Sequence, residues 1–110
     1  MLEPSPKYAF ITGSGRRVGR QLAYAFAERG YNIVLHANEA VDGMKEAAER
    51  IESMGRFVFM TQADLMQADE VLRLAAEVRS AVPRLDVLVN NAGVFPEKKF
   101  EDVTPDDWDR

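Results

Sequence analysis

Short apolar runs alternate with longer amphipathic segments along this chain. The apolar runs cover residues 8–12, 32–36, 57–61 and 86–90. Between them, apolar positions recur three and four residues apart over about 17–29, 41–54 and 68–82, which is the spacing of one helical face. Gly30 and Gly55 follow the first two of these segments and Pro83 follows the third, where helices commonly stop. The pattern predicts four β-strands alternating with three α-helices.

This alternation repeats about every 25 residues, which is the length of a βαβ unit and not of a solenoid repeat. Such units have right-handed crossovers and build a parallel sheet. The predicted fold class is therefore α/β with a doubly wound parallel sheet. A chain of 110 residues is long enough for one compact domain, so residues 1–110 are predicted to form a single domain.

The last residues read as the start of a further helix. Thr104 suits the N-cap, Pro105 the first helical position, and Asp106 and Asp107 the first turn. Only residues 108–110 follow, and an isolated helix of one turn is marginal. We therefore expect the domain to be partial.

Glycines separate the first predicted strand from the first predicted helix. Gly13, Gly15 and Gly19 form G-x-G-x-x-x-G, which departs from the dinucleotide pattern G-x-G-x-x-G. Backbone N–H groups at such a helix start can bind phosphate. A plain glycine turn in an unrelated α/β protein is the alternative.

Charge and composition narrow the classes of function. A net charge of -4 disfavours a nucleic-acid binder, although Arg16, Arg17 and Arg20 cluster beside the glycines. Without cysteine the chain has no disulfide, thiolate nucleophile or cysteine-ligated metal. No stretch has the apolar length of a signal-peptide core or a membrane span, so we expect a cytoplasmic protein without membrane contact.

Several motifs together resemble the N-terminal half of the short-chain dehydrogenases/reductases over residues 8–110. They are Thr12-Gly13, the later Gly19, Asp64-Leu65 after the third strand, and the run Asn90-Asn91-Ala92-Gly93 after the fourth. The resemblance implies a Rossmann-type doubly wound sheet and an NAD(P)-dependent oxidoreductase. Such an enzyme transfers a hydride between a nicotinamide and a carbonyl or imine.

One departure points to a branch of that family. Arg17 stands where the family pattern T-G-x-x-x-G-x-G has glycine, and with Leu35-His36 it resembles the pteridine reductases and dihydromonapterin reductases. This implies a pterin substrate near Arg17 and Phe95. Ordinary packing at a strand end is the alternative for Phe95.

The resemblance implies a set of cofactor-binding residues. They are Gly13, Ser14, Arg16, Arg17, Val18, Gly19, His36, Asn38, Asp64, Leu65, Asn91, Ala92 and Gly93. Backbone groups around Gly13, Ser14 and Gly19 would hold the pyrophosphate. Asp64 would accept a hydrogen bond from the adenine amino group, or alternatively cap the next helix.

The same positions favour NADP(H) over NAD(H). Arg16 would bind the 2′-phosphate, and Asn38 stands where an acid would accept the 2′-hydroxyl of NAD. Glu39 opposes this preference unless its carboxylate points away.

The family's catalytic Tyr-x-x-x-Lys pair is absent, since none of Tyr8, Tyr24 and Tyr31 has lysine four positions later. No catalytic residue is assigned, and the 110 residues alone are expected to be inactive. His36 suits the adenosine pocket better than acid/base chemistry, and the acids from Glu101 onward suit helix capping better than a metal.

Two other functions stay open. One is a half-length nucleotide-binding or assembly module without catalysis, and the other is another nucleotide-using α/β enzyme such as a methyltransferase. A P-loop is excluded because no G-K-[ST] occurs. A full-length reductase would take a small-molecule substrate and form a homo-oligomer, either a dimer or a tetramer.

Overall fold

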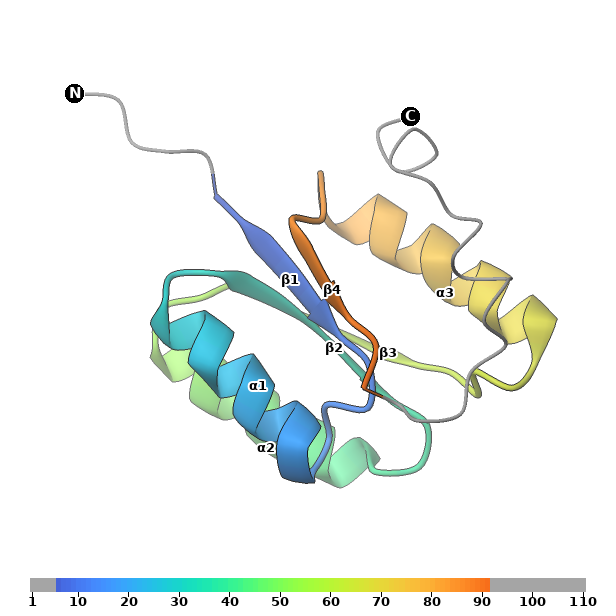
Figure 1. The fold of residues 1–110 in the computed structure, drawn as a ribbon, viewed down its shortest axis with the longest axis horizontal. Helices are drawn as coiled ribbons and strands as arrows, with labels where there is room; N and C mark the ends of the chain where they lie inside the picture. Colours follow the sequence, from blue (N-terminus) through green and yellow to red (C-terminus); the bar gives the residue numbers. More distant parts are fainter. Residues whose placement is uncertain (1–5, 92–110) are drawn as a thin grey trace.

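A computed structural model describes residues 6–91 of the chain (Figure 1). Its elements, in chain order, are β1 (Tyr8–Ile11), α1 (Arg17–Glu28), β2 (Asn32–Ala37), α2 (Val41–Ser53), β3 (Val58–Gln62), α3 (Ala68–Ala81) and β4 (Val87–Val89). Every predicted strand and helix up to residue 91 is confirmed, with ends that shift by one or two residues. The helix start predicted at Thr104 lies outside the described residues.

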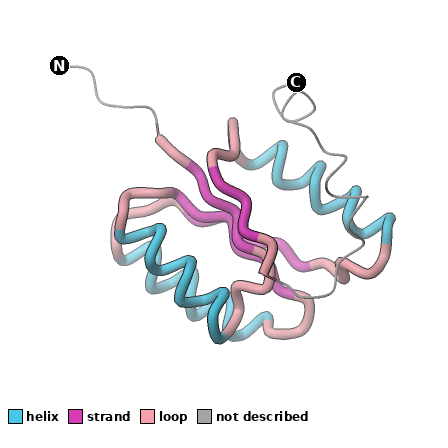
Figure 2. Tube along the Cα trace, viewed as in Figure 1, coloured by secondary structure: helices cyan, strands magenta, loops and turns pink. Residues whose placement is uncertain are grey.

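The four strands form one parallel sheet in the order β3-β2-β1-β4. β1 lies between β2 and β4, so Phe10 is opposite Val34 on one side and Leu88 on the other. This order places the carboxyl ends of β1 and its two neighbours at one edge of the sheet, and Figure 2 shows loops gathered there. The predicted doubly wound α/β sheet is thereby confirmed.

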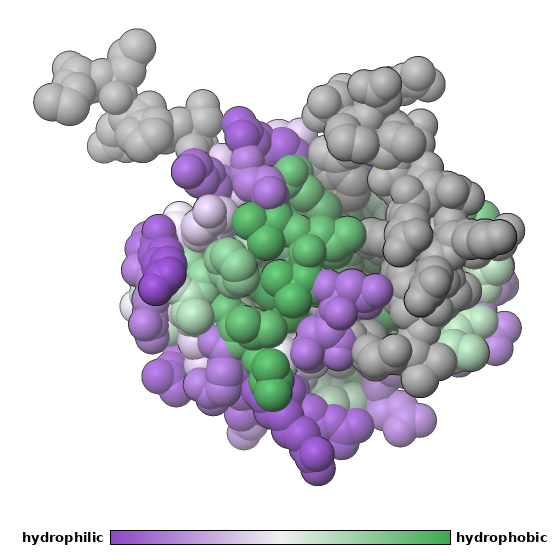
Figure 3. Space-filling view, viewed as in Figure 1, coloured by the Kyte–Doolittle hydropathy of each residue, from purple (hydrophilic) through white to green (hydrophobic). Residues whose placement is uncertain are grey.

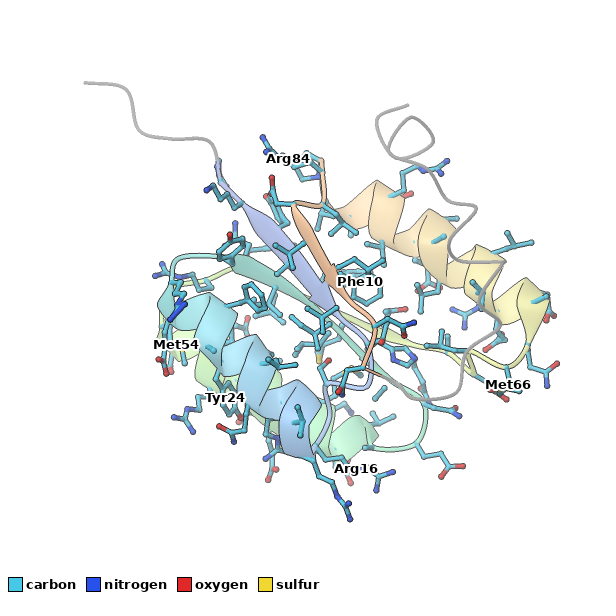
Figure 4. The ribbon with its side chains drawn as sticks, in the orientation of Figure 1. Phe10, Arg16, Tyr24, Met54, Met66 and Arg84 are labelled. Carbon is cyan, nitrogen blue, oxygen red and sulfur yellow. The ribbon has the colours of Figure 1, made fainter. Side chains whose placement is uncertain are left out.

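Helices cover both faces of the sheet. α1 and α2 lie on one face and α3 lies on the other (Figure 1). Each face has its own buried core: Ile33 and Leu35 pack toward α1 and α2, while Phe10 and Val34 pack toward α3. Figure 4 shows the Phe10 ring between the sheet and α3. A central parallel strand that is apolar on both sides needs this arrangement.

None of the helices described between residues 6 and 91 combines the length and the apolar composition that crossing a membrane requires.

Candidate functional site

The turn between β1 and α1 has an unusual backbone. Gly13 has a φ of 63°, which suits glycine, but Arg17 also has a positive φ, of 55°. Arg16 occupies the N-cap of α1 without a side-chain capping hydrogen bond, and the first turn contains no acidic residue. The positive end of the helix dipole thus carries arginines where side-chain acceptors are usual. Such an end favours an anionic ligand.

Side chains from the end of β4 brace the turn. The Asn91 backbone N–H donates to Thr12 Oγ1 over 2.9 Å, and the Asn91 side-chain amide donates to the Gly13 carbonyl over 3.3 Å. Gly19 packs onto the same carbonyl, because a Cβ there would lie 2.2 Å from the Gly13 oxygen. The residues Thr12, Gly13, Gly19 and Asn91 therefore lock β1, α1 and β4 together.

His36 braces the other side of the turn. Its Nδ1 accepts a hydrogen bond from the Gly13 N–H over 3.0 Å, so Nε2 carries the proton that is donated to the Ala63 carbonyl over 2.9 Å. The Ser14 N–H donates to the His36 carbonyl over 2.8 Å, and the His36 N–H donates to Ser14 Oγ over 2.9 Å. His36 thus joins the turn, β2 and the end of β3.

This environment keeps the imidazole neutral. His36 is 2% exposed, and burial lowers its pKa from the ordinary value of 6.5 despite the bond to the Ala63 carbonyl. A proton on Nδ1 would also point at the Gly13 N–H. His36 is therefore unsuited to acid/base work at neutral pH, and it orients the turn.

An open hollow of about 500 Å³ lies at the carboxyl ends of β1 and β2. The residues that line it are Gly13, Gly15, Arg16, Arg17, Val18, His36, Ala37, Asn38, Glu39, Ala40 and Asn91. Arg16 and Arg17 are exposed on one wall, where α1 begins, and Glu39 is exposed on the other. Figure 4 shows Arg16 at the end of α1 that lies beside the start of α2.

Most of the predicted cofactor-binding residues meet at this hollow. Those that line it are Gly13, Arg16, Arg17, Val18, His36, Asn38 and Asn91. Ser14 is fully buried behind it, and Gly19 packs under the turn. The N–H groups of Gly13 and Ser14, which the sequence analysis expected to hold the pyrophosphate, both donate to His36 instead.

Asp64 and Leu65 lie apart from these residues. Asp64 lines another open hollow with Asn38, Gln62 and side chains of α3, and its carboxylate accepts the Met66 N–H over 2.9 Å. Leu65 is buried in the core beneath α3. Asn38 borders both hollows, which makes it the link between them. The predicted Ala92, Gly93 and Phe95 lie outside the described residues.

Arg20 and Gly43 have structural roles next to the hollow that the sequence analysis did not assign to them. Arg20 reaches from α1 to α2, and Gly43 of α2 packs against the turn. The signals were present, since Arg20 belongs to the arginine cluster and Gly43 is an isolated glycine inside a helical pattern.

The chain is similar to known proteins over most of its length. The family model "short chain dehydrogenase" matches residues 7–110. The chain is 35% identical over 103 residues to 3-oxoacyl-(acyl-carrier-protein) reductase FabG of Staphylococcus epidermidis, covering 94% of this chain and 42% of that protein. It is 35% identical over 104 residues to the hydroxynaphthalene reductase-like protein Arp2 of Metarhizium anisopliae, covering 94% of this chain and 39% of that protein.

Solved structures give the same result. A metagenomic short-chain oxidoreductase in complex with NADP superposes with a TM-score of 0.74 at 33% identity, covering 80% of this chain and 39% of that one. Acetoin dehydrogenase from Enterobacter cloacae superposes with a TM-score of 0.79 at 29% identity, covering 84% of this chain and 36% of that one. The chain thus spans about two fifths of the length of these proteins, and it belongs to the short-chain dehydrogenase family.

Proposed function

We propose that this chain forms the NADP(H)-binding part of a reductase that transfers a hydride to a carbonyl or imine carbon. The observation that carries the proposal is the uncapped, arginine-rich start of α1, which opens onto the hollow at the strand ends. Here residues 1–110 act as one partial dinucleotide-binding domain. Substrate groups and the catalytic acid would come from the rest of the native polypeptide, which we expect to form a homo-oligomer.

The charges at the hollow suit a phosphorylated cofactor. Arg16 and Arg17 add positive charge where the helix dipole already favours an anion, so a bound phosphate would be attracted by both. A guanidinium is planar and donates paired hydrogen bonds to phosphate oxygens. When bound, a nicotinamide cofactor supplies the hydride, and Arg16, Arg17 and the amides of the turn would hold its phosphates.

The preference for NADP(H) rests on the residues after β2. Asn38 has no charge to repel a 2′-phosphate, and Arg16 stands on the opposite wall. Glu39 is exposed, which allows its carboxylate to point into solvent. A similar solved structure, the metagenomic oxidoreductase, is a complex with NADP, which supports this choice of cofactor.

For the substrate we favour a carbonyl over a pterin. The relatives named above include a 3-oxoacyl reductase and a hydroxynaphthalene reductase-like protein, and neither is a pteridine reductase. The pterin prediction rests on the sequence alone, through Arg17 and Leu35-His36. Assays with both substrate classes would decide between them.

Removing the Arg16 charge tests the proposed cofactor site. We expect Arg16→Ala, in the native full-length polypeptide, to weaken NADPH binding about tenfold and NADH binding much less, because only NADPH carries the 2′-phosphate. Titration of cofactor fluorescence measures both dissociation constants. Arg29→Ala is the matched control, since Arg29 is exposed at the other end of α1. Equal losses for NADPH and NADH would contradict the assignment of Arg16.

A nucleotide-binding module without catalysis would share the same hollow. The two functions separate in one assay, the consumption of NADPH with a carbonyl substrate. Binding without consumption across a panel of carbonyls and pterins would favour the module.

A further inference from the structure

Two separate parts of the chain form the walls of the hollow. The turn after β1 and the start of α1 form one wall, and the end of β2 with the loop before α2 forms the other. Figure 1 shows the starts of α1 and α2 next to each other. The walls meet where Gly15 packs on Ala40. A Cβ on Gly15 would lie 2.5 Å from the Ala40 carbonyl oxygen and 3.0 Å from the Ala40 Cβ. The separation of the walls is therefore set by a contact that leaves no space for a side chain.

A second close contact lies behind the first. Gly43, in the first turn of α2, packs so tightly that a Cβ there would lie 2.2 Å from the Gly15 carbonyl oxygen. The backbone of α2 thus rests directly on the backbone of the turn. Glycine is a poor helix former, and the close approach of the two backbones explains why it is present at position 43.

Arg20 joins the two backbones at this point. Its Nη2 donates to the Gly15 carbonyl over 3.0 Å and to the Gly43 carbonyl over 3.0 Å. The same nitrogen lies 3.3 Å from Glu46, whose side chain is 73% exposed. Arg20 itself is not among the residues that line the hollow. Its contact with the hollow is therefore indirect, through the backbone of Gly15, which does line it.

The position of Arg20 is unfavourable in two other respects. A cation in the first turn of a helix opposes the dipole, and Arg20 Nε is buried without a hydrogen-bond partner within residues 6–91. The exposed pair with Glu46 contributes little, since ion pairs in solvent are weak. The hydrogen bonds to the Gly15 and Gly43 carbonyls are therefore the main favourable interactions of the Arg20 guanidinium.

We propose that Arg20 is a positioning residue for cofactor specificity, holding the turn and the start of α2 at the spacing that the adenosine phosphates need. The inference rests on the proposed function. Arg16 and Asn38 stand on opposite walls, so a change in spacing moves one relative to the other. Substitutions at Arg20 or Gly43 then alter the choice between NADPH and NADH without touching either cofactor.

Four variants of the native full-length polypeptide test this proposal: Arg20→Met, Arg20→Lys, Gly43→Ala and Glu46→Gln. Dissociation constants for NADPH and NADH are measured for each, together with the melting temperature. We expect Arg20→Met and Gly43→Ala to weaken NADPH binding about tenfold and to reduce the preference for NADPH over NADH. Arg20→Lys should lie between these and the wild type, because an ammonium can donate to both carbonyls as Nη2 does, but from a shorter side chain. Glu46→Gln, which removes only the exposed partner, should stay within about twofold.

The outcomes are distinct. The proposal is overturned if the ratio of the NADPH and NADH dissociation constants is the same in Arg20→Met as in the wild type, whatever the melting temperature. Arg20 would then contribute to stability alone. If Arg20→Met does not fold, the ratio for Arg20→Lys decides in the same way. If the wild type binds neither cofactor, the proposed function itself fails, and this is seen before any variant is compared.

Discussion

Arg17 is an arginine in a backbone conformation that favours glycine. Its φ of 55° lies in the left-handed region, at the position where the family pattern has glycine. A side chain in that region costs about 1 kcal/mol or more. The chain therefore accepts local strain and gains a second guanidinium at the mouth of the hollow.

Comparing glycine with alanine at this position separates strain from charge. Both Arg17→Gly and Arg17→Ala remove the cation, but only glycine relieves the positive φ. We expect Arg17→Gly to have a free energy of unfolding about 1 kcal/mol above that of Arg17→Ala, with equal affinity for NADPH. Urea unfolding measures the difference. Identical stabilities would show that position 17 is unstrained.

His36 makes stability depend on pH. The folded state keeps it neutral with a lowered pKa, while the unfolded chain titrates near 6.5. Above pH 6.5 the contribution of His36 is complete. Below it the unfolded state takes up a proton that the folded state does not, so the free energy of unfolding falls by up to about 1.4 kcal/mol per pH unit until the folded pKa is reached.

Unfolding between about pH 8 and pH 5.5 tests this dependence, a window in which the ordinary pKa of 6.5 falls. The carboxyl of Glu70 titrates below the window, because its hydrogen bond with Arg73 lowers its pKa from 4.5. His36→Gln should show a flat profile. NMR titration of the wild-type imidazole gives the same information without a variant, and a midpoint at or above 6.5 would refute the assignment.

At the scale of elements, the periodicity of the sequence predicted the helices well. The apolar positions of α3 that recur at helical spacing, such as Val71, Leu74 and Val78, are all buried, because they form one stripe that faces the sheet. Strand ends differ slightly, since short apolar runs carry no cap to mark where pairing stops.

The contacts between elements were less accessible from the sequence. The sequence analysis interpreted the glycines of the turn as a ligand site. In the structure, Gly19 packs against the backbone of Gly13, and Gly43 of α2 packs against the backbone of Gly15. The use of the Gly13 N–H by His36 depends on a pairing between residues far apart in the chain. Such contacts follow from the sheet order, which local patterns do not specify.

At the scale of the molecule, β4 forms one edge of the described sheet. Within residues 6–91 no strand pairs with its outer side, and Leu88 is 46% exposed. Figure 3 shows apolar surface across the face that carries β4 and α1. Unpaired apolar edges recruit other strands.

We therefore expect a polypeptide of residues 1–110 to associate through β4. Leu88→Lys should reduce the association, because a charge on an edge strand opposes pairing. Leu72→Lys adds the same charge at a 57% exposed position of α3 and serves as the control. Sedimentation velocity measures the species present. A monodisperse monomer of the unmodified polypeptide would contradict the prediction.

The pairing of β1 with one strand close to it in the sequence and one far from it also suggests an order of events during synthesis. β1 meets β2 within about 25 residues, but its other neighbour, and the Asn91 amide that holds the turn, leave the ribosome some 80 residues after β1. Contacts between distant segments form late because closing a long loop costs entropy. The nascent chain thus has the start of α1 with its arginines long before Asn91 can hold the turn after β1 in place.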